Sequence, residues 1–237
     1  MTRYPTTTRF RRYEIKVVLD SVRVAQVLDH CRLRLLPDRF ASAEEGYDLT
    51  TLYLDTDGYR VHHKLIDGTG TKYRVRRYGA EDLIYLERKT RQGTLVRKRR
   101  EPRPFTDLAL VLSGDLQGEG FVPTFCRTIR DFGLRPALLL TYRRRAWLGP
   151  AGSRLTLDDS VAAWQGAGIA ALKRDGPPVE VTQGTILELK YDGEMPKEFR
   201  DLLDQLALPS GGFSKYGTGL LACGLVPPKP STNVPAP

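Results

Sequence analysis

Residues 72–78 read Lys-Tyr-Arg-Val-Arg-Arg-Tyr. Successive side chains of a β-strand point to opposite faces of the sheet, so residues two apart share a face. In this segment one face carries the bases Lys72, Arg74 and Arg76, and the other carries Tyr73 and Val75. The segment therefore predicts a strand with one basic face and one face suited to burial.

Other segments repeat this alternation. Their charged faces are, in chain order, those of Arg12, Glu14 and Lys16; of Tyr85, Glu87, Lys89 and Arg91; of Tyr142 and Arg144; of Arg154, Thr156 and Asp158; and of Glu188 and Lys190. Turn clusters such as Asp57-Gly58 and Gln92-Gly93 separate the segments, and short connections favour antiparallel pairing. The pattern predicts eight strands, over residues 12–19, 47–55, 72–78, 83–91, 94–100, 138–147, 154–161 and 185–191.

Helical periodicity is confined to four stretches, over residues 20–36, 123–132, 197–208 and 214–223. A chain of 237 residues fits one domain, here of mainly β (α+β) structure. We expect that domain at residues 12–226, after a basic N-terminal arm at residues 1–11. Residues 227–237 are rich in proline and predict a disordered tail.

The composition favours a polyanionic partner. The formal net charge is +9 and the pI is near 9.6, a balance suited to nucleic acid, phosphorylated molecules, polyphosphate or an anionic membrane face. No apolar run reaches membrane-spanning length and the N-terminus has no signal-peptide core, so a soluble cytoplasmic protein is expected. Cys31, Cys126 and Cys223 are too few and too scattered for a disulfide framework or a zinc site, and we expect buried thiols.

The charged faces admit two interpretations. A charged face on one strand is normally a solvated outer face, and periodicity alone leaves that interpretation level with its rival. In the rival, the apolar faces pack outward beneath helices and the charged faces line a lumen, which in an eight-stranded barrel holds side chains and one narrow ligand. A lumen crowded with lysine and arginine would repel itself unless a polyanion occupied it. We therefore predict a closed eight-stranded antiparallel β-barrel tunnel with a few flanking helices.

Acids on the same faces need a role: Glu14, Glu87, Asp158 and Glu188. They either hold a divalent metal, since such ions take oxygen ligands from carboxylates, phosphates and water, or anchor the bases beside them. For Glu14 and Glu87 the two roles weigh equally. Glu188 lies in the most apolar strand, where an unpaired carboxylate would be costly, and it is the first candidate for a metal ligand.

Other chemistry finds little support. The sequence has no glycine-rich phosphate loop, and His62 and His63 would point to opposite faces of a strand. Ser214-Lys215 marks a helix start, where backbone N–H groups and the lysine can meet an anion, although a plain N-cap fits equally. Aromatic residues lie mainly on the non-basic faces, so a nucleic-acid binder, which stacks bases on aromatic rings among its cations, is not expected.

Nine short motifs follow one another along roughly residues 9–225: Arg12-Tyr13-Glu14-Ile15-Lys16, Leu52-Tyr53-Leu54-Asp55-Thr56, Lys72-Tyr73-Arg74-Val75-Arg76, Leu86-Glu87-Arg88-Lys89, Val96-Arg97-Lys98-Arg99, Tyr142-Arg143-Arg144-Arg145-Ala146, Arg154-Leu155-Thr156-Leu157-Asp158, Ile186-Leu187-Glu188-Leu189-Lys190 and Phe213-Ser214-Lys215-Tyr216. In this order they resemble the polyphosphate-polymerase domain of the vacuolar transporter chaperone (VTC) family. That family is a branch of the triphosphate tunnel metalloenzymes, the CYTH-like superfamily.

The resemblance implies a tunnel that moves the γ-phosphate of ATP onto a growing polyphosphate chain with Mn²⁺ or Mg²⁺. The expected partners are ATP, triphosphate and polyphosphate, and a membrane partner and the oligomeric state stay open. The implied catalytic bases are Lys16, Arg74, Arg76, Lys89, Lys98, Arg144 and Lys190. Further substrate contacts would come from Lys72, Tyr53, Tyr142, Ser214 and Lys215. Glu188 would bind the metal, with Glu14, Glu87 and Asp158 as the other candidates.

The sequence departs from the resemblance in two places. Many tunnel enzymes open with Glu-x-Glu-x-Lys, but Arg12 stands in place of the first acid. This change removes a metal ligand and favours the polymerase branch over a cyclase or a thiamine-triphosphatase. The sequence also lacks the inositol-phosphate-sensing domain and the membrane helices of the eukaryotic VTC proteins, so we do not expect their regulation or their coupling to translocation.

Two rival functions stay open. A hydrolase of the same fold would use water as the acceptor and cut tripolyphosphate or nucleoside triphosphates, and the same tunnel would serve it. A non-catalytic polyphosphate-binding domain would bind with strong salt dependence and without turnover. The products formed from ATP and Mn²⁺ distinguish these functions.

Overall fold

The computed structural model describes residues 7–10, 12–38, 46–92, 95–208 and 213–228. Strands of this part of the chain form one antiparallel sheet in the order β1-β7-β6-β5-β4-β8-β9-β11-β2, and β3 and β10 add to β8 and β9. The strands are β1 (Thr7–Phe10), β2 (Arg12–Leu19), β3 (Leu36–Pro37), β4 (Tyr47–Asp55), β5 (Lys72–Tyr78), β6 (Leu83–Gln92), β7 (Leu95–Pro104), β8 (Arg135–Leu148), β9 (Arg154–Trp164), β10 (Val179–Glu180) and β11 (Thr185–Asp192). The eight predicted strands are therefore confirmed.

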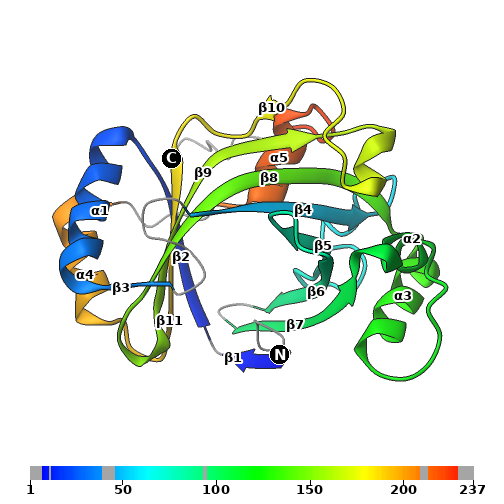
Figure 1. The fold of residues 1–237 in the computed structure, drawn as a ribbon, viewed down its shortest axis with the longest axis horizontal. Helices are drawn as coiled ribbons and strands as arrows, with labels where there is room; N and C mark the ends of the chain where they lie inside the picture. Colours follow the sequence, from blue (N-terminus) through cyan, green and yellow to red (C-terminus); the bar gives the residue numbers. More distant parts are fainter. Residues whose placement is uncertain (1–6, 11, 39–45, 93–94, 209–212, 229–237) are drawn as a thin grey trace, which may run out of the picture.

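The prediction of a closed barrel is wrong. The sheet curls around a central region as a half-barrel (Figure 1), with β1 at one end and β2 at the other. These two strands are neighbours in the chain, yet β1 pairs with β7 and β2 pairs with β11. The N-terminal segment thus changes partner where the sheet edges meet, and no backbone register among the described residues joins β2 to β7.

The ends of the chain differ in part from expectation. Residues 7–10, predicted only as part of a basic arm, form β1. Pro227 and Pro228 are exposed, and the rest of the predicted tail, residues 229–237, lies outside the described residues. In the described part of the chain, no helix is both long enough and apolar enough to cross a membrane.

The predicted helices form close to their expected bounds: α1 (Ser21–Arg34), α3 (Phe121–Phe132), α4 (Lys197–Leu206) and α5 (Lys215–Ala222). Asp20 caps α1, its Oδ1 accepting from Arg23 N at 2.8 Å. Gly133 ends α3 in the left-handed conformation at φ 61°. The short α2 (Leu108–Ser113) and the 3₁₀ turns η1 (Phe105–Asp107), η2 (Pro150–Gly152) and η3 (Ala167–Ala171) were not predicted.

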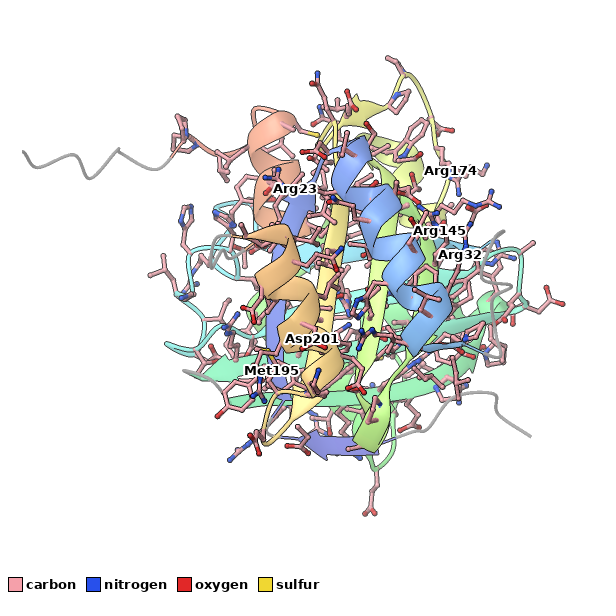
Figure 2. The ribbon with its side chains drawn as sticks, turned by 90° about the vertical axis from the view of Figure 1, so that its left-hand side faces the viewer. Arg23, Arg32, Arg145, Arg174, Met195 and Asp201 are labelled. Atoms are coloured by element: carbon pink, nitrogen blue, oxygen red, sulfur yellow. The ribbon has the colours of Figure 1, made fainter. Side chains whose placement is uncertain are left out.

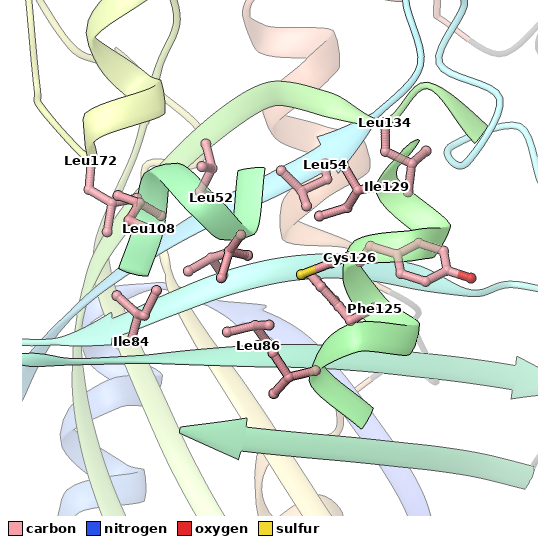
Figure 3. Close-up of a cluster of buried hydrophobic side chains, with 14 of the residues drawn as sticks. Leu52, Leu54, Ile84, Leu86, Leu108, Phe125, Cys126, Ile129, Leu134 and Leu172 are labelled. Atoms are coloured by element: carbon pink, nitrogen blue, oxygen red, sulfur yellow. The ribbon is translucent and has the colours of Figure 1, made fainter. Parts of the chain in front are cut away.

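Two of the three apolar clusters lie on the outer face of the sheet. Helices α1 and α4 lie side by side over β9, β11 and β2 (Figure 2), and Phe199 and Leu202 of α4 are fully buried there. Helices α2 and α3 cover β4, β5 and β6, where Leu52, Ile84 and Phe125 are buried (Figure 3). The prediction that the apolar faces pack outward beneath helices is confirmed.

The third cluster lies on the inner face, beneath α5. It includes Leu138 and Leu140, which precede Tyr142 and Arg144 on one face of β8. A Cβ at Gly219 would lie 2.7 Å from Leu138 Cδ2, so glycine at this position lets α5 approach the strand closely. Apolar packing therefore fills part of the space inside the sheet and leaves the rest to charged side chains.

Candidate functional site

The charged faces of the strands meet inside the curled sheet. Ion pairs join elements that are not adjacent in it: Lys89 of β6 binds Glu14 of β2 with both Nζ–Oε distances at 2.7 Å, and Lys215 of α5 lies 2.5 Å from Asp158 of β9. The bases gathered there are Lys16, Lys72, Arg74, Arg76, Lys89, Lys98, Arg100, Arg144, Lys190 and Lys215, and the acids are Glu14, Glu87, Asp158 and Glu188. The structure brings together all of the charged site residues predicted from the sequence. The predicted Tyr53, Tyr142 and Ser214 border this set and contact its bases.

Glu87 is the centre of one group of bases. Its carboxylate is fully buried, with Arg74 Nη2 at 2.6 Å and Lys98 Nζ at 2.8 Å. Arg100 Nε and Arg76 Nη1 lie farther away, at 3.6 and 3.8 Å. Burial alone would raise the pKa of Glu87, but the surrounding bases, led by Arg74 and Arg76, hold it well below the usual range. Glu87 is therefore ionised and fixes the positions of these bases.

Asp158 is the centre of a second group. Arg144 binds it in a bidentate fork, with Nε to Oδ1 at 2.6 Å and Nη2 to Oδ2 at 2.7 Å. Despite burial, which raises a carboxyl pKa, Arg144 and Lys215 lower the pKa of Asp158 to about 2. The register places Asp158 directly opposite Arg144 across the β8–β9 pair, so the strand pairing itself builds this contact.

Glu188 and Glu14 share one ammonium group. Lys16 Nζ lies 3.1 Å from Glu188 Oε1 and 3.2 Å from Glu14 Oε2. Glu188 also contacts Lys190 at 2.9 Å and Arg144 at 3.4 Å. Burial opposes ionisation of Glu188, but Lys16 and Lys190 outweigh it and hold the pKa well below normal. A cation already lies between these two carboxylates, so their oxygens are placed to bind positive charge together.

Tyrosines and a serine hold the bases from the other side. Arg74 Nη1 donates to Tyr53 Oη and Arg76 Nη2 to Tyr142 Oη, both at 3.1 Å. Arg74 and Lys72 lower the pKa of the buried Tyr53 to about 8, against the effect of burial.

Lys72 is the first residue of β5, and its side chain reaches the start of α5. Its Nζ donates to Ser214 Oγ at 2.9 Å, and Ser214 Oγ also accepts from Gly217 N at 3.2 Å, so Ser214 is the N-cap of α5 as well as a partner of the lysine. The plain N-cap interpretation of the Ser214-Lys215 helix start is thus confirmed, and binding of an anion there stays a prediction.

The site carries a large positive excess. Among the described residues, ten bases against four acids leave an excess of six positive charges in the site; the net charge of the whole chain is +9. Burial together with neighbouring bases lowers the pKa of Lys72 and of Lys190 to about 8, and holds the pKa of Lys98 well below its usual range. These three lysines therefore hold their protons less tightly than usual, as expected where positive charge lacks a counter-ion.

Sequence reasoning assigned no role to three residues of this face. The guanidinium of Arg100 lies 3.8 Å from the centre of the Tyr85 ring. Arg100 is two residues after Lys98 on β7 and therefore shares its face. Arg154 donates to Tyr47 Oη at 3.1 Å and pairs with the buried Asp38 at 2.6 Å. Thr156 Oγ1, beside Glu188 in register, is buried without a hydrogen-bond partner in the described structure. Their positions on the charged faces were the signal that could have found them.

The acids fit a divalent metal only in part. No three His, Cys, Asp or Glu side chains of the described residues are grouped as a metal site. Glu87 and Asp158 are each enclosed by bases. Glu188 and Glu14, which share one cation already, are the pair that fits best, with the remaining oxygen ligands drawn from phosphate and water.

Comparison with known proteins agrees with this geometry. Residues 11–223 match the VTC domain family, and the chain belongs to that family. No curated protein matches the sequence. The resemblance seen in the nine motifs is thereby confirmed.

Solved structures share the fold at low identity. A protein described as an adenylate cyclase candidate from Bacillus halodurans superposes with a TM-score of 0.53 at 12% identity, covering 86% of this chain and 96% of that one. A Hippeastrum protein, assigned as an adenylyl cyclase and stated to have a dominant triphosphatase activity, gives a TM-score of 0.51 at 16% identity, covering 92% and 98%. The chain thus shares the fold of these two proteins.

Proposed function

We propose that this protein is a metal-dependent polyphosphate polymerase that transfers the γ-phosphate of ATP to a growing polyphosphate chain. The observation that carries the proposal is the six-charge positive excess inside the curled sheet, in a chain of the VTC domain family. Only a ligand with several negative charges, closely spaced, would offset bases on β2, β5, β6, β7, β8, β11 and α5 at once. A chain of phosphates is such a ligand.

The protein's part in this reaction is to bind and orient phosphates. Phosphoryl transfer depends mainly on positioning and on stabilising charge. Arg74, Arg76 and Arg144 are held by carboxylates and tyrosines, so their guanidinium groups are oriented before a phosphate arrives. In this proposal the lysines supply mobile charges along the rest of the chain, and the end phosphate of the acceptor attacks the γ-phosphorus without a protein nucleophile.

Each acid has a proposed role in the same site. Glu87 and Asp158 anchor bases, since each is fully buried against two or more of them. Glu188 and Glu14 would hold Mn²⁺ or Mg²⁺ in place of, or beside, the Lys16 ammonium. A bound divalent ion would neutralise phosphate oxygens and orient the triphosphate.

A triphosphate hydrolase is the second candidate. The triphosphatase activity stated for the Hippeastrum protein, which has the same fold, favours it. In a hydrolase the same bases would hold the triphosphate and water would take the place of the acceptor chain.

Phosphorus-31 NMR of the purified protein with ATP and Mn²⁺ tests the proposal. A polymerase produces the signal of internal polyphosphate groups together with ADP. A hydrolase gives orthophosphate and no internal signal, which would contradict polymerisation and leave the site assignment standing. No reaction, with triphosphate still bound, would indicate a binding domain.

A further inference from the structure

The outer face of β6 is apolar and buried in its first half and basic and partly exposed farther along. Ile84 and Leu86 are buried in the cluster beneath α2 and α3. The next outward position, Arg88, belongs to no apolar cluster and is partly exposed, and on the neighbouring strand β7 Arg97 and Arg99 are exposed. We call Arg88, Arg97 and Arg99 the outer arginine patch.

The charges of this patch are uncompensated. Arg88 directly opposes Arg99 across the β6–β7 pair, and Arg97 opposes Thr90. Like charges directly opposite one another destabilise a strand pair. The guanidinium of Arg99 lies over the Phe121 ring at 5.0 Å, a contact that orients it without neutralising it. No carboxylate of the described residues forms an ion pair with any of the three arginines.

The same two strands carry bases on both faces. Lys89 and Lys98 oppose each other on the inner face, and each is the sequence neighbour of a patch arginine. The Lys98 side chain is 33% exposed, so the interior site reaches solvent beside this hairpin. Positive charge therefore continues from the inner face to the outer face at one end of β6 and β7.

We propose that the outer arginine patch binds the part of a long polyphosphate chain that extends beyond the interior site. This inference rests on the proposed function, because it needs a polyphosphate in the interior. The strand pairing sets the Cβ atoms of Arg88 and Arg99 about 5 Å apart, with Arg97 at the diagonal position about 7–8 Å from Arg88. Guanidinium groups match phosphate oxygens well. A triphosphate is held by the interior bases alone, so the patch distinguishes long chains from short ones.

The test uses the full chain with Arg88, Arg97 and Arg99 all changed to Gln. The matched control changes Arg23, Arg32 and Arg200 to Gln, which removes the same charge from α1 and α4, on another face of the molecule (Figure 2). Binding of triphosphate and of long-chain polyphosphate is measured by calorimetry over a range of salt concentrations. Binding to phosphatidylserine vesicles is measured in parallel.

We expect the patch variant to bind long polyphosphate about tenfold more weakly, since each exposed charge pair contributes modestly. The slope of log affinity against log salt should fall by roughly one unit for each phosphate-binding arginine that the variant removes. Triphosphate binding, the control variant and the unfolding temperature should change little.

Three results would overturn the inference. The first is a patch variant that binds long polyphosphate with wild-type affinity. The second is a control variant that loses as much polyphosphate affinity as the patch variant. The third is a patch variant that loses only its binding to vesicles, which would make the patch a membrane-binding surface. Failure of the wild-type protein to bind either triphosphate or polyphosphate would instead refute the proposed function itself.

Discussion

Two halves of the interior site hold phosphate-binding bases in different ways. In the inner half, near α5, Arg76 and Arg144 are buried, with 6% and 10% of their side chains exposed, and each is bound to a carboxylate or a tyrosine. In the seam half, where the sheet edges meet, Lys16, Lys89 and Lys98 are 22%, 20% and 33% exposed. Arginine presents a rigid fork of donors and lysine a mobile point charge.

This difference between fixed arginines and mobile lysines suggests two tasks, the recognition of phosphate groups and the entry of a phosphate chain. A buried, oriented guanidinium selects for phosphate geometry and loses little entropy on binding, whereas a partly exposed ammonium can follow a chain that moves. The open seam between β2 and β7 thus coincides with the flexible bases, and the hydrogen-bonded centre of the sheet coincides with the fixed ones. We expect the inner half to dominate affinity and the seam half to accommodate chains of different length.

Glu188 touches both halves, and its substitution should have the largest effect. Glu188→Gln removes the carboxylate that contacts Arg144 of the inner half and Lys16 of the seam half. If it holds the metal, turnover with Mn²⁺ should fall by about 100-fold or more, while triphosphate binding without metal should be kept. Steady-state kinetics measures the turnover with Mn²⁺, and calorimetry without metal measures the triphosphate affinity.

The paired readout separates two roles of Glu188. Loss of metal-free binding together with turnover would assign Glu188 to anchoring bases. Near-normal turnover with Mn²⁺ would refute the metal assignment. Glu14→Gln is the matched variant, because it removes the other carboxylate beside Lys16.

Removal of the fully buried Glu87 carboxylate, which contacts bases of both halves, should have the next largest effect, on stability. Glu87→Gln leaves Arg74, Lys98 and their neighbours without the charge they surround. Breaking a buried pair in this way costs about 3–5 kcal/mol, measured as the free energy of unfolding in urea. Glu81→Gln, outside this network, is the control.

A polyanion should reverse part of that loss. Because Glu87 compensates positive charge, adding triphosphate should stabilise the Glu87→Gln variant more than it stabilises the wild type. Equal stabilisation of both proteins would show that the interior bases are not what binds the ligand.

The alternation of side chains predicted most of this site because strand pairing is local. Once Arg74 and Glu87 were placed on the same face of neighbouring strands, their contact followed from register. Arg100 lay within the predicted strand, on the face of Lys98, but was given no role; the strand itself runs on to Pro104. The contact of Arg100 with Tyr85 depends on packing that the sequence pattern does not contain.

The alternation of charged and apolar residues could not predict that the sheet stays open. Each strand of a half-barrel and of a closed barrel shows the same pattern, and the difference lies in which edges pair at long range. β1 is four residues long and its pairing with β7 joins segments nearly ninety residues apart. Whether the two edges of the sheet pair with each other thus depends on one short strand, and four residues carry too little sequence pattern to predict its partner.

Alanine substitutions in the two halves should differ in their effect on binding. Arg76→Ala removes charge-assisted hydrogen bonds, each contributing about 1.5–3 kcal/mol, so triphosphate affinity should fall at least tenfold. Lys98→Ala removes a partly exposed charge and should cost about fivefold or less. Calorimetry at fixed ionic strength, with Arg32→Ala as the surface control, checks both. Equal losses in the two halves would contradict the comparison.

The smallest expected effect is a dependence of affinity on pH. Burial and neighbouring charges lower the pKa of Lys72 and Lys190 to about 8 in the free protein, and a bound polyanion should raise it. Both lysines are mostly protonated at pH 7 with or without ligand, so their titration should change affinity little below that pH. Above it, only the bound state keeps its protons, and affinity should fall about threefold from pH 7 to pH 8.

Proton uptake gives this prediction a second readout. Binding at pH 8 should take up protons, which calorimetry detects as a heat that varies with the ionisation enthalpy of the buffer. In the double variant Lys72→Arg/Lys190→Arg these positions no longer titrate, so proton uptake should fall by the contribution of these two lysines, while that of the ligand and of the other titrating groups remains. If the double variant takes up as many protons as the wild type, the two lysines do not face the ligand.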